Sequence, residues 1–153
     1  MKNGKLSLKY EIYIAAPAEK VWKALTDGSA TKQYFYGCAV QSTFKKAASI
    51  SYLGDGDFSL FDGEILDVKP EARLVATFQA HWDEKVSKDN SSRVAWELTP
   101  MGQSTRLTLV HDRFTEETAT YKQSASGWNV ILSSLKTYIE TGKPLQLGKT
   151  ASS

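Results

Sequence analysis

The stretch that decides the fold is residues 116–141, EETATYKQSASGWNVILSSLKTYIET. Its apolar side chains recur at steps of three and four residues, which is the spacing of one face of an α-helix. They are Tyr121, Ala125, Trp128, Ile131, Leu132, Leu135, Tyr138 and Ile139. At about 1.5 Å of rise per residue, such a helix is roughly 39 Å long, which exceeds the width of a small domain. A helix with so broad an apolar face needs an equally broad apolar partner.

Short strands upstream of the helix can supply that partner. Apolar and polar side chains alternate in several segments, as is typical of strands with one buried face. The segments are residues 6–14, 40–44, 48–52, 73–82, 93–98 and 107–111, and residues 58–68 form a further candidate strand. Turn sequences such as Gly54-Asp55-Gly56-Asp57 and Pro100-Met101-Gly102 separate them. We therefore predict an α+β fold in which a curved antiparallel sheet wraps around the long C-terminal helix, with two short helices after the first strand.

Cap residues predict where the helices begin and end. Pro17 suits the first turn of one short helix, and Ser29 can cap a second. Thr115 can cap the long helix, and Gly142 can end it. The polar segment 83–92 is predicted to form a loop.

The size of the chain fits one domain. With 153 residues it can bury most of its apolar surface in a single core. We find no internal repeat and no linker, so we predict one domain over residues 5–142 and a flexible tail over residues 143–153. Cys38 is the sole cysteine, which excludes an intrachain disulfide, a thiolate-rich zinc site and an iron–sulfur centre.

Charge and hydropathy exclude several partners. The net charge of +2 comes without a concentrated lysine and arginine stripe, so a nucleic-acid partner is not expected. No run of apolar residues approaches the roughly 18 needed for a membrane span, so membrane insertion is not expected either. The N-terminal residues lack the apolar core of a secretory signal, and we predict a cytoplasmic protein.

Six segments, in this order and spacing, resemble the START-like SRPBCC superfamily: residues 14–27, 63–70, 73–78, 94–100, 105–111 and 127–128. The closer likeness is to its branch named after the activator of the 90-kDa heat-shock chaperone ATPase. The resemblance implies a helix-grip fold, with an apolar cavity between the sheet and the C-terminal helix. It does not imply one activity, because the superfamily includes lipid carriers, hormone-binding proteins, cyclases and co-chaperone domains. Ala47-Ala48 stands where relatives often carry glycine.

The strand phases predict which side chains face the long helix. Together with the helix they define a candidate ligand cavity lined by Phe78, Trp82, Trp96, Leu98, Leu109, His111, Tyr121, Trp128 and Leu132. A cavity of this kind suits a flat or aliphatic molecule. The alternative is that the same aromatic side chains fill a solid core with no room for a ligand.

The chemistry-bearing residues are few. His111 could be a polar handle or a proton shuttle in the cavity, or a structural histidine held by hydrogen bonds. With only two histidines and one cysteine in the chain, we assign no metal site, no cofactor and no catalytic residue.

Three functions follow as hypotheses. The first is non-enzymatic binding of a small hydrophobic or aromatic molecule, lipid-like or polyketide-like. The second, implied by the name of the branch, is regulation of a chaperone ATPase, with the chaperone as partner. The third is a cyclase- or hydrolase-like enzyme that uses His111 and a pocket acid or tyrosine, such as Tyr121, in the same cavity. Both a monomer and a homodimer are compatible with the sequence.

Overall fold

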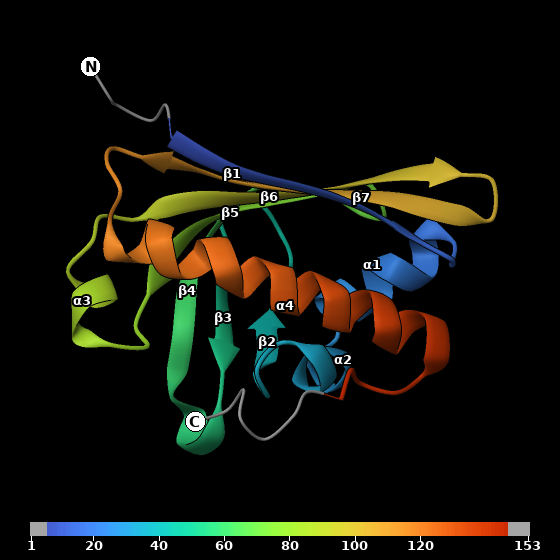
Figure 1. The fold of residues 1–153 in the computed structure, drawn as a ribbon, viewed down its shortest axis with the longest axis horizontal. Helices are drawn as coiled ribbons and strands as arrows, with labels where there is room; N and C mark the ends of the chain where they lie inside the picture. Colours follow the sequence, from blue (N-terminus) through green and yellow to red (C-terminus); the bar gives the residue numbers. More distant parts are fainter. Residues whose placement is uncertain (1–5, 147–153) are drawn as a thin grey trace.

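The computed structural model describes residues 6–146 (Figure 1). Residue 5 and most of the predicted tail, residues 147–153, lie outside the described part of the chain. The strands form one seven-stranded sheet in the order β1-β7-β6-β5-β4-β3-β2. Every neighbouring pair is antiparallel. The predicted α+β fold with a long C-terminal helix is confirmed.

The elements follow the predicted order, with one additional short helix and one 3-10 turn between strands. The strands are β1 (Leu6–Ile14), β2 (Ala39–Ser42), β3 (Ser49–Leu53), β4 (Ser59–Lys69), β5 (Arg73–Ala80), β6 (Ser92–Met101) and β7 (Ser104–Phe114). The helices are α1 (Ala18–Thr26), α2 (Gly28–Tyr34), α3 (Glu84–Ser87) and α4 (Ala119–Thr141), with a 3-10 turn η1 (Asp55–Asp57).

The sheet bends, so that β2, β3 and β4 run at a steep angle to β1, β6 and β7 in Figure 1. The bend coincides with a register shift between Ile65 and Asp67, where β4 pairs with β5. Nearby, a Cβ on Gly63 would lie 1.9 Å from the carbonyl oxygen of Thr77. Only glycine permits this close approach of the two strands. The bent sheet wraps around α4, while α1 and α2 cover the end where α4 finishes (Figure 1).

Two predicted helix starts are wrong by a few residues. Asp27, and not Ser29, caps α2, because its side chain accepts a hydrogen bond from the Ser29 amide at 2.9 Å. Thr118, and not Thr115, caps α4 by accepting from the Tyr121 amide at 3.1 Å. In both cases neighbouring residues offered similar capping oxygens, so local sequence did not choose between them.

The prediction of a loop over residues 83–92 is also wrong in part. Asp83 caps α3 by accepting from the Val86 amide at 2.9 Å. Val86 is fully buried and anchors the segment to the core. A helix of four residues carries too few apolar positions to show a period, which is why the pattern did not reveal it.

Ala47 adopts a backbone conformation that glycine takes more readily than alanine. Its φ of 72° lies in the left-handed region. The Ala47 amide donates to the Ile65 carbonyl at 2.8 Å, and the Ile65 amide donates to the Ala48 carbonyl at 2.9 Å. These two bonds tie the connection between β2 and β3 to β4.

Candidate functional site

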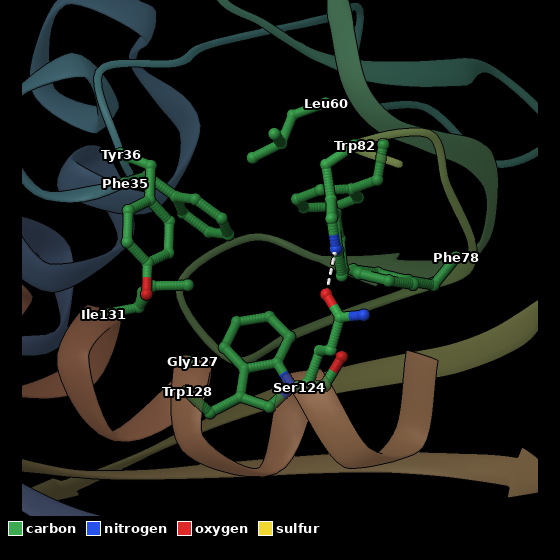
Figure 2. Close-up of a pocket in the computed structure, with 11 residues that line it drawn as sticks. Phe35, Tyr36, Leu60, Phe78, Trp82, Ser124, Gly127, Trp128 and Ile131 are labelled. Carbon is green, nitrogen blue, oxygen red and sulfur yellow. Dashed lines mark hydrogen bonds between the residues drawn. The ribbon is translucent and has the colours of Figure 1, made fainter. Parts of the chain in front are cut away.

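A cavity of about 360 Å³ lies between the bent sheet and the N-terminal half of α4. Figure 2 shows the side chains that surround it, with Trp128, Ser124 and Gly127 on α4 and with Leu60 and Trp82 across from them. The volume falls within the range of about 300–1,000 Å³ that is usual for small-molecule sites. The lining consists of Phe35, Tyr36, Leu60, Phe61, Phe78, Trp82, Gln123, Ser124, Gly127, Trp128 and Ile131.

The structure distributes the predicted cavity residues over several places. Phe78, Trp82 and Trp128 line the cavity. Trp96 borders a much smaller void of about 20 Å³ and packs edge-on against Trp128, with ring centres 5.6 Å apart. The remaining predicted residues, Leu98, Leu109, His111, Tyr121 and Leu132, lie outside the cavity lining.

Those remaining residues have packing roles. Leu98, Leu109 and Leu132 are buried in the core. Tyr121 stands edge-on against Phe114, with ring centres 5.1 Å apart. These positions follow the predicted inward face of the strands and helix. The cavity, however, occupies only one end of that face.

His111 is a buried structural histidine. The Nε1–H of Trp128 donates to His111 Nδ1 at 3.0 Å, so Nδ1 carries no proton. His111 Nε2 is then the protonated nitrogen and donates to Ser92 Oγ at 2.7 Å. Burial lowers the pKa of His111 from 6.5 to about 3, which keeps the ring neutral. Both nitrogens are engaged, and neither is available to a molecule in the cavity.

Sequence reasoning missed most of the residues that line the cavity. Phe35 and Tyr36 follow α2, where no strand or helix period applies. Tyr36 has a φ of 52°, is 57% exposed and lines the cavity, which places it at the cavity mouth. Ser124 and Gly127 share a face of α4 with Trp128, so helical spacing could have found them. They were missed because only apolar side chains were counted.

A chain of hydrogen bonds fastens one wall of the cavity to α4. Trp82 Nε1 donates to Gln123 Oε1 at 2.6 Å (Figure 2), and Gln123 Nε2 donates to Asp83 Oδ2 at 3.2 Å. Further along the same segment, Asp89 Oδ2 accepts from the amide and hydroxyl of Thr120 at 2.8 and 2.7 Å. The segment that carries α3 is thus held against the first turns of α4.

The electrostatics of the lining are neutral. None of its eleven side chains is a carboxylate, lysine, arginine or histidine. Although Tyr36 is largely exposed, partial burial of its hydroxyl raises its pKa, so the hydroxyl stays protonated. Among the described residues, Ser124 Oγ is the one buried side-chain polar atom without a hydrogen-bond partner.

A second hollow of about 440 Å³ lies beside the C-terminal end of α4 and differs in character. Lys20, Lys23, Asp27 and Glu140 are among its lining residues. It is a polar surface depression and suits an apolar molecule poorly. Within residues 6–146, no group of three or more histidine, cysteine, aspartate or glutamate side chains could hold a metal ion. None of the described helices has the length and apolar character needed to cross a membrane.

The family assignment agrees with this geometry. Residues 15–140 match the family described as Activator of Hsp90 ATPase homolog 1-like protein. The chain belongs to this family. The predicted START-like superfamily, its branch and the helix-grip fold are therefore confirmed. Among curated proteins, none matches the chain.

Solved structures share the same fold. The crystal structure of DynU16, a protein in the dynemicin biosynthetic locus, is 29% identical with a TM-score of 0.72, and the match covers 90% of this chain and 48% of that one. This chain thus spans about half the length of DynU16. CalU16 from Micromonospora echinospora is 24% identical over 91% of this chain and 76% of its own, with a TM-score of 0.72. The Aha1 dimer from Colwellia psychrerythraea is 20% identical over 90% and 98%, also at 0.72.

Proposed function

We propose that the protein binds one small, hydrophobic, ring-containing molecule in the cavity between the sheet and α4, without chemical turnover. The observation that carries this proposal is the cavity itself, which holds about 360 Å³ among aromatic and aliphatic side chains. Release of water from such a surface favours an apolar guest. The likeness to DynU16, a protein in the dynemicin biosynthetic locus, is compatible with a small-molecule ligand.

The arrangement of aromatic rings favours a flat guest. Phe61 and Phe78 are stacked with centres 4.2 Å apart, whereas Phe35 and Trp82 stand edge-on to Trp128 and Phe78 respectively. Faces and edges are therefore both available for offset stacking and edge contacts. At about 0.5 kcal/mol per heavy atom, a two-ring molecule would bind with a Kd on the order of 0.1 mM, and a larger natural ligand more tightly.

An enzymatic role of His111 and Tyr121 has less support. A general acid or base must reach the substrate within hydrogen-bond distance. His111 already uses both ring nitrogens in bonds to Trp128 and Ser92, and neither His111 nor Tyr121 lines the cavity. Binding without turnover needs no such group.

Regulation of a chaperone ATPase is a second candidate, which the description of the family favours. It would use the outer surface of the domain and does not require the cavity to be filled. Adding the protein to a purified 90-kDa heat-shock chaperone and measuring ATP hydrolysis tests it. A change in rate supports the candidate, and an unchanged rate at saturating protein contradicts it.

The test of the proposed function is a titration with a flavonoid, a lysolipid and naphthalene, followed by tryptophan emission. Trp82 and Trp128 line the cavity, so a guest should change their emission. Gly127→Leu provides the cavity-filling variant. A Cβ at this position meets only the Tyr36 hydroxyl, at 3.7 Å, and the rest of the leucine side chain would extend into the cavity.

The matched control is Ser126→Leu, which adds the same side chain on the exposed face of α4. We expect at least one of the three molecules to bind the wild type and the Ser126→Leu variant, and to bind Gly127→Leu at least tenfold more weakly. No response from any molecule, or equal binding to Gly127→Leu, would contradict the proposal.

A further inference from the structure

The cavity contains one unused polar group. Ser124 is 6% exposed, lines the cavity from α4, and its Oγ makes no hydrogen bond to any described residue. Buried hydroxyl groups are nearly always paired, because an unpaired one gives up its bonds to water and gains nothing in exchange. The neighbouring polar groups are already occupied, since Gln123 bonds to Trp82 and Asp83, and Thr120 bonds to Asp89. Because Ser124 lines the cavity, a molecule inside the cavity can supply the missing partner.

The same surroundings exclude a charged guest. No positive side chain lines the cavity, so a carboxylate placed there would be desolvated without a counter-charge. Two carboxylates, Asp83 and Asp89, bond to Gln123 and Thr120 beside the cavity and would repel an anion. Neither carboxylate lines the cavity, so a cationic guest would find no counter-charge among the lining residues.

We infer that the ligand is a neutral, planar aromatic molecule with a phenol or carbonyl oxygen, and that this oxygen forms a hydrogen bond with Ser124 Oγ. This inference rests on the proposed function and narrows its ligand class. A serine hydroxyl both donates and accepts, so it fits either oxygen. The ring system lies against Trp128 and Phe78, and the oxygen fixes its orientation along α4.

Equilibrium dialysis with three probes of nearly equal shape tests the inference. Naphthalene has no polar atom, 1-naphthol adds one neutral hydroxyl, and 1-naphthoate adds a negative charge at pH 7.5. Each probe is measured with the wild type, with Ser124→Ala, and with Ser133→Ala as a control on the exposed face of the same helix. Alanine suits a helix interior, so both variants should fold.

For the wild type and Ser133→Ala, we expect 1-naphthol to bind roughly threefold to tenfold more tightly than naphthalene, as one neutral hydrogen bond provides. In Ser124→Ala, naphthalene should still bind, and 1-naphthol should bind no more tightly than naphthalene. We also expect 1-naphthoate to bind the wild type at least tenfold more weakly than 1-naphthol.

Two results would overturn the inference and leave the proposed function standing. One is a naphthol preference that survives in Ser124→Ala, which would show that the hydroxyl is not the partner. The other is 1-naphthoate binding as tightly as 1-naphthol. Failure of all three probes to bind the wild type would instead refute the proposed function, and the inference with it.

Discussion

The two halves of α4 meet the sheet in different ways. In the C-terminal half, Leu132, Leu135 and Ile139 are 3%, 0% and 5% exposed, and α1 and α2 pack at this end (Figure 1). In the N-terminal half, Ser124 and Gly127 face the cavity. Branched aliphatic side chains fill the space between helix and sheet in one half. A serine and a glycine are too small to fill it in the other.

The contrast separates stability from binding along a single helix. The filled half provides the dispersion contacts and apolar burial that hold the fold together. The open half gives up part of those contacts and leaves room for a guest. Trp128 lies where the two halves meet, because it lines the cavity and also bonds to buried His111.

The largest expected effect is that of Trp128→Ala. Trp128 is almost fully buried, and its removal should lower the free energy of unfolding by roughly 3–5 kcal/mol. Trp128→Phe keeps an aromatic ring but leaves His111 Nδ1 without its donor. This variant should lower the free energy of unfolding by about 1–3 kcal/mol. Urea denaturation measures both. Equal losses for the two variants would show that the hydrogen bond, and not packing, makes Trp128 important.

The next prediction compares a residue of the filled half with a residue that lines the cavity. Leu135→Ala should lower the free energy of unfolding by about 2–5 kcal/mol, as expected for a fully buried aliphatic side chain. Ile131→Ala should lower the free energy of unfolding by less, because one side of Ile131 faces the cavity and packs against no other side chain there. Urea denaturation of the two variants provides the measurement. A larger loss for Ile131→Ala would mean that the cavity is filled in solution.

A pH dependence follows from His111. Its folded-state pKa of about 3 lies below its ordinary value of 6.5, so protons bind preferentially to the unfolded chain. Stability from this group is complete above pH 6.5 and is lost as the pH falls towards 3. Between pH 7.5 and pH 5 the loss should be about 2 kcal/mol. Urea denaturation of the wild type and of His111→Gln at several pH values measures this loss. If the free energy of unfolding falls with pH equally in both proteins, His111 is not the cause.

The smallest expected effect is a gain. Ser124→Ala removes an unpaired buried hydroxyl and adds helix propensity, so it should raise the free energy of unfolding by about 1 kcal/mol in the absence of ligand. Ser133 lies on the exposed face, so Ser133→Ala should raise the free energy of unfolding only by the gain in helix propensity. Thermal denaturation compares them. A loss of stability in Ser124→Ala would show that the hydroxyl has a partner, such as an ordered water molecule.

The sequence predicted the fold well because the fold rests on local periods. Alternation in residues 93–98 and 107–111 placed Trp96, Leu98 and Leu109 on the buried face, where the structure has them. The period of α4 and Gly142 at its end gave the helix, and Gly142 indeed has a φ of 82°. Patterns of this kind depend only on neighbours along the chain.

The cavity was less predictable because it depends on packing between distant segments. The alternation of residues 73–82 predicted a strand that continues to Trp82, but β5 ends at Ala80. Trp82 lies beyond the strand and is held beside the cavity by its hydrogen bond to Gln123. Tyr36 is placed by a left-handed backbone conformation that no periodicity describes. Ser124 and Gly127 carry no apolar signal, although their small size is what leaves the space open.

The most direct test of the account is a crystal structure of the protein soaked with 1-naphthol. The account predicts density for one ring system inside the cavity, in van der Waals contact with Trp128, Phe78 and Gly127. A structure in which Trp82 or Tyr36 occupies that space, with no ring density between sheet and helix, would contradict it.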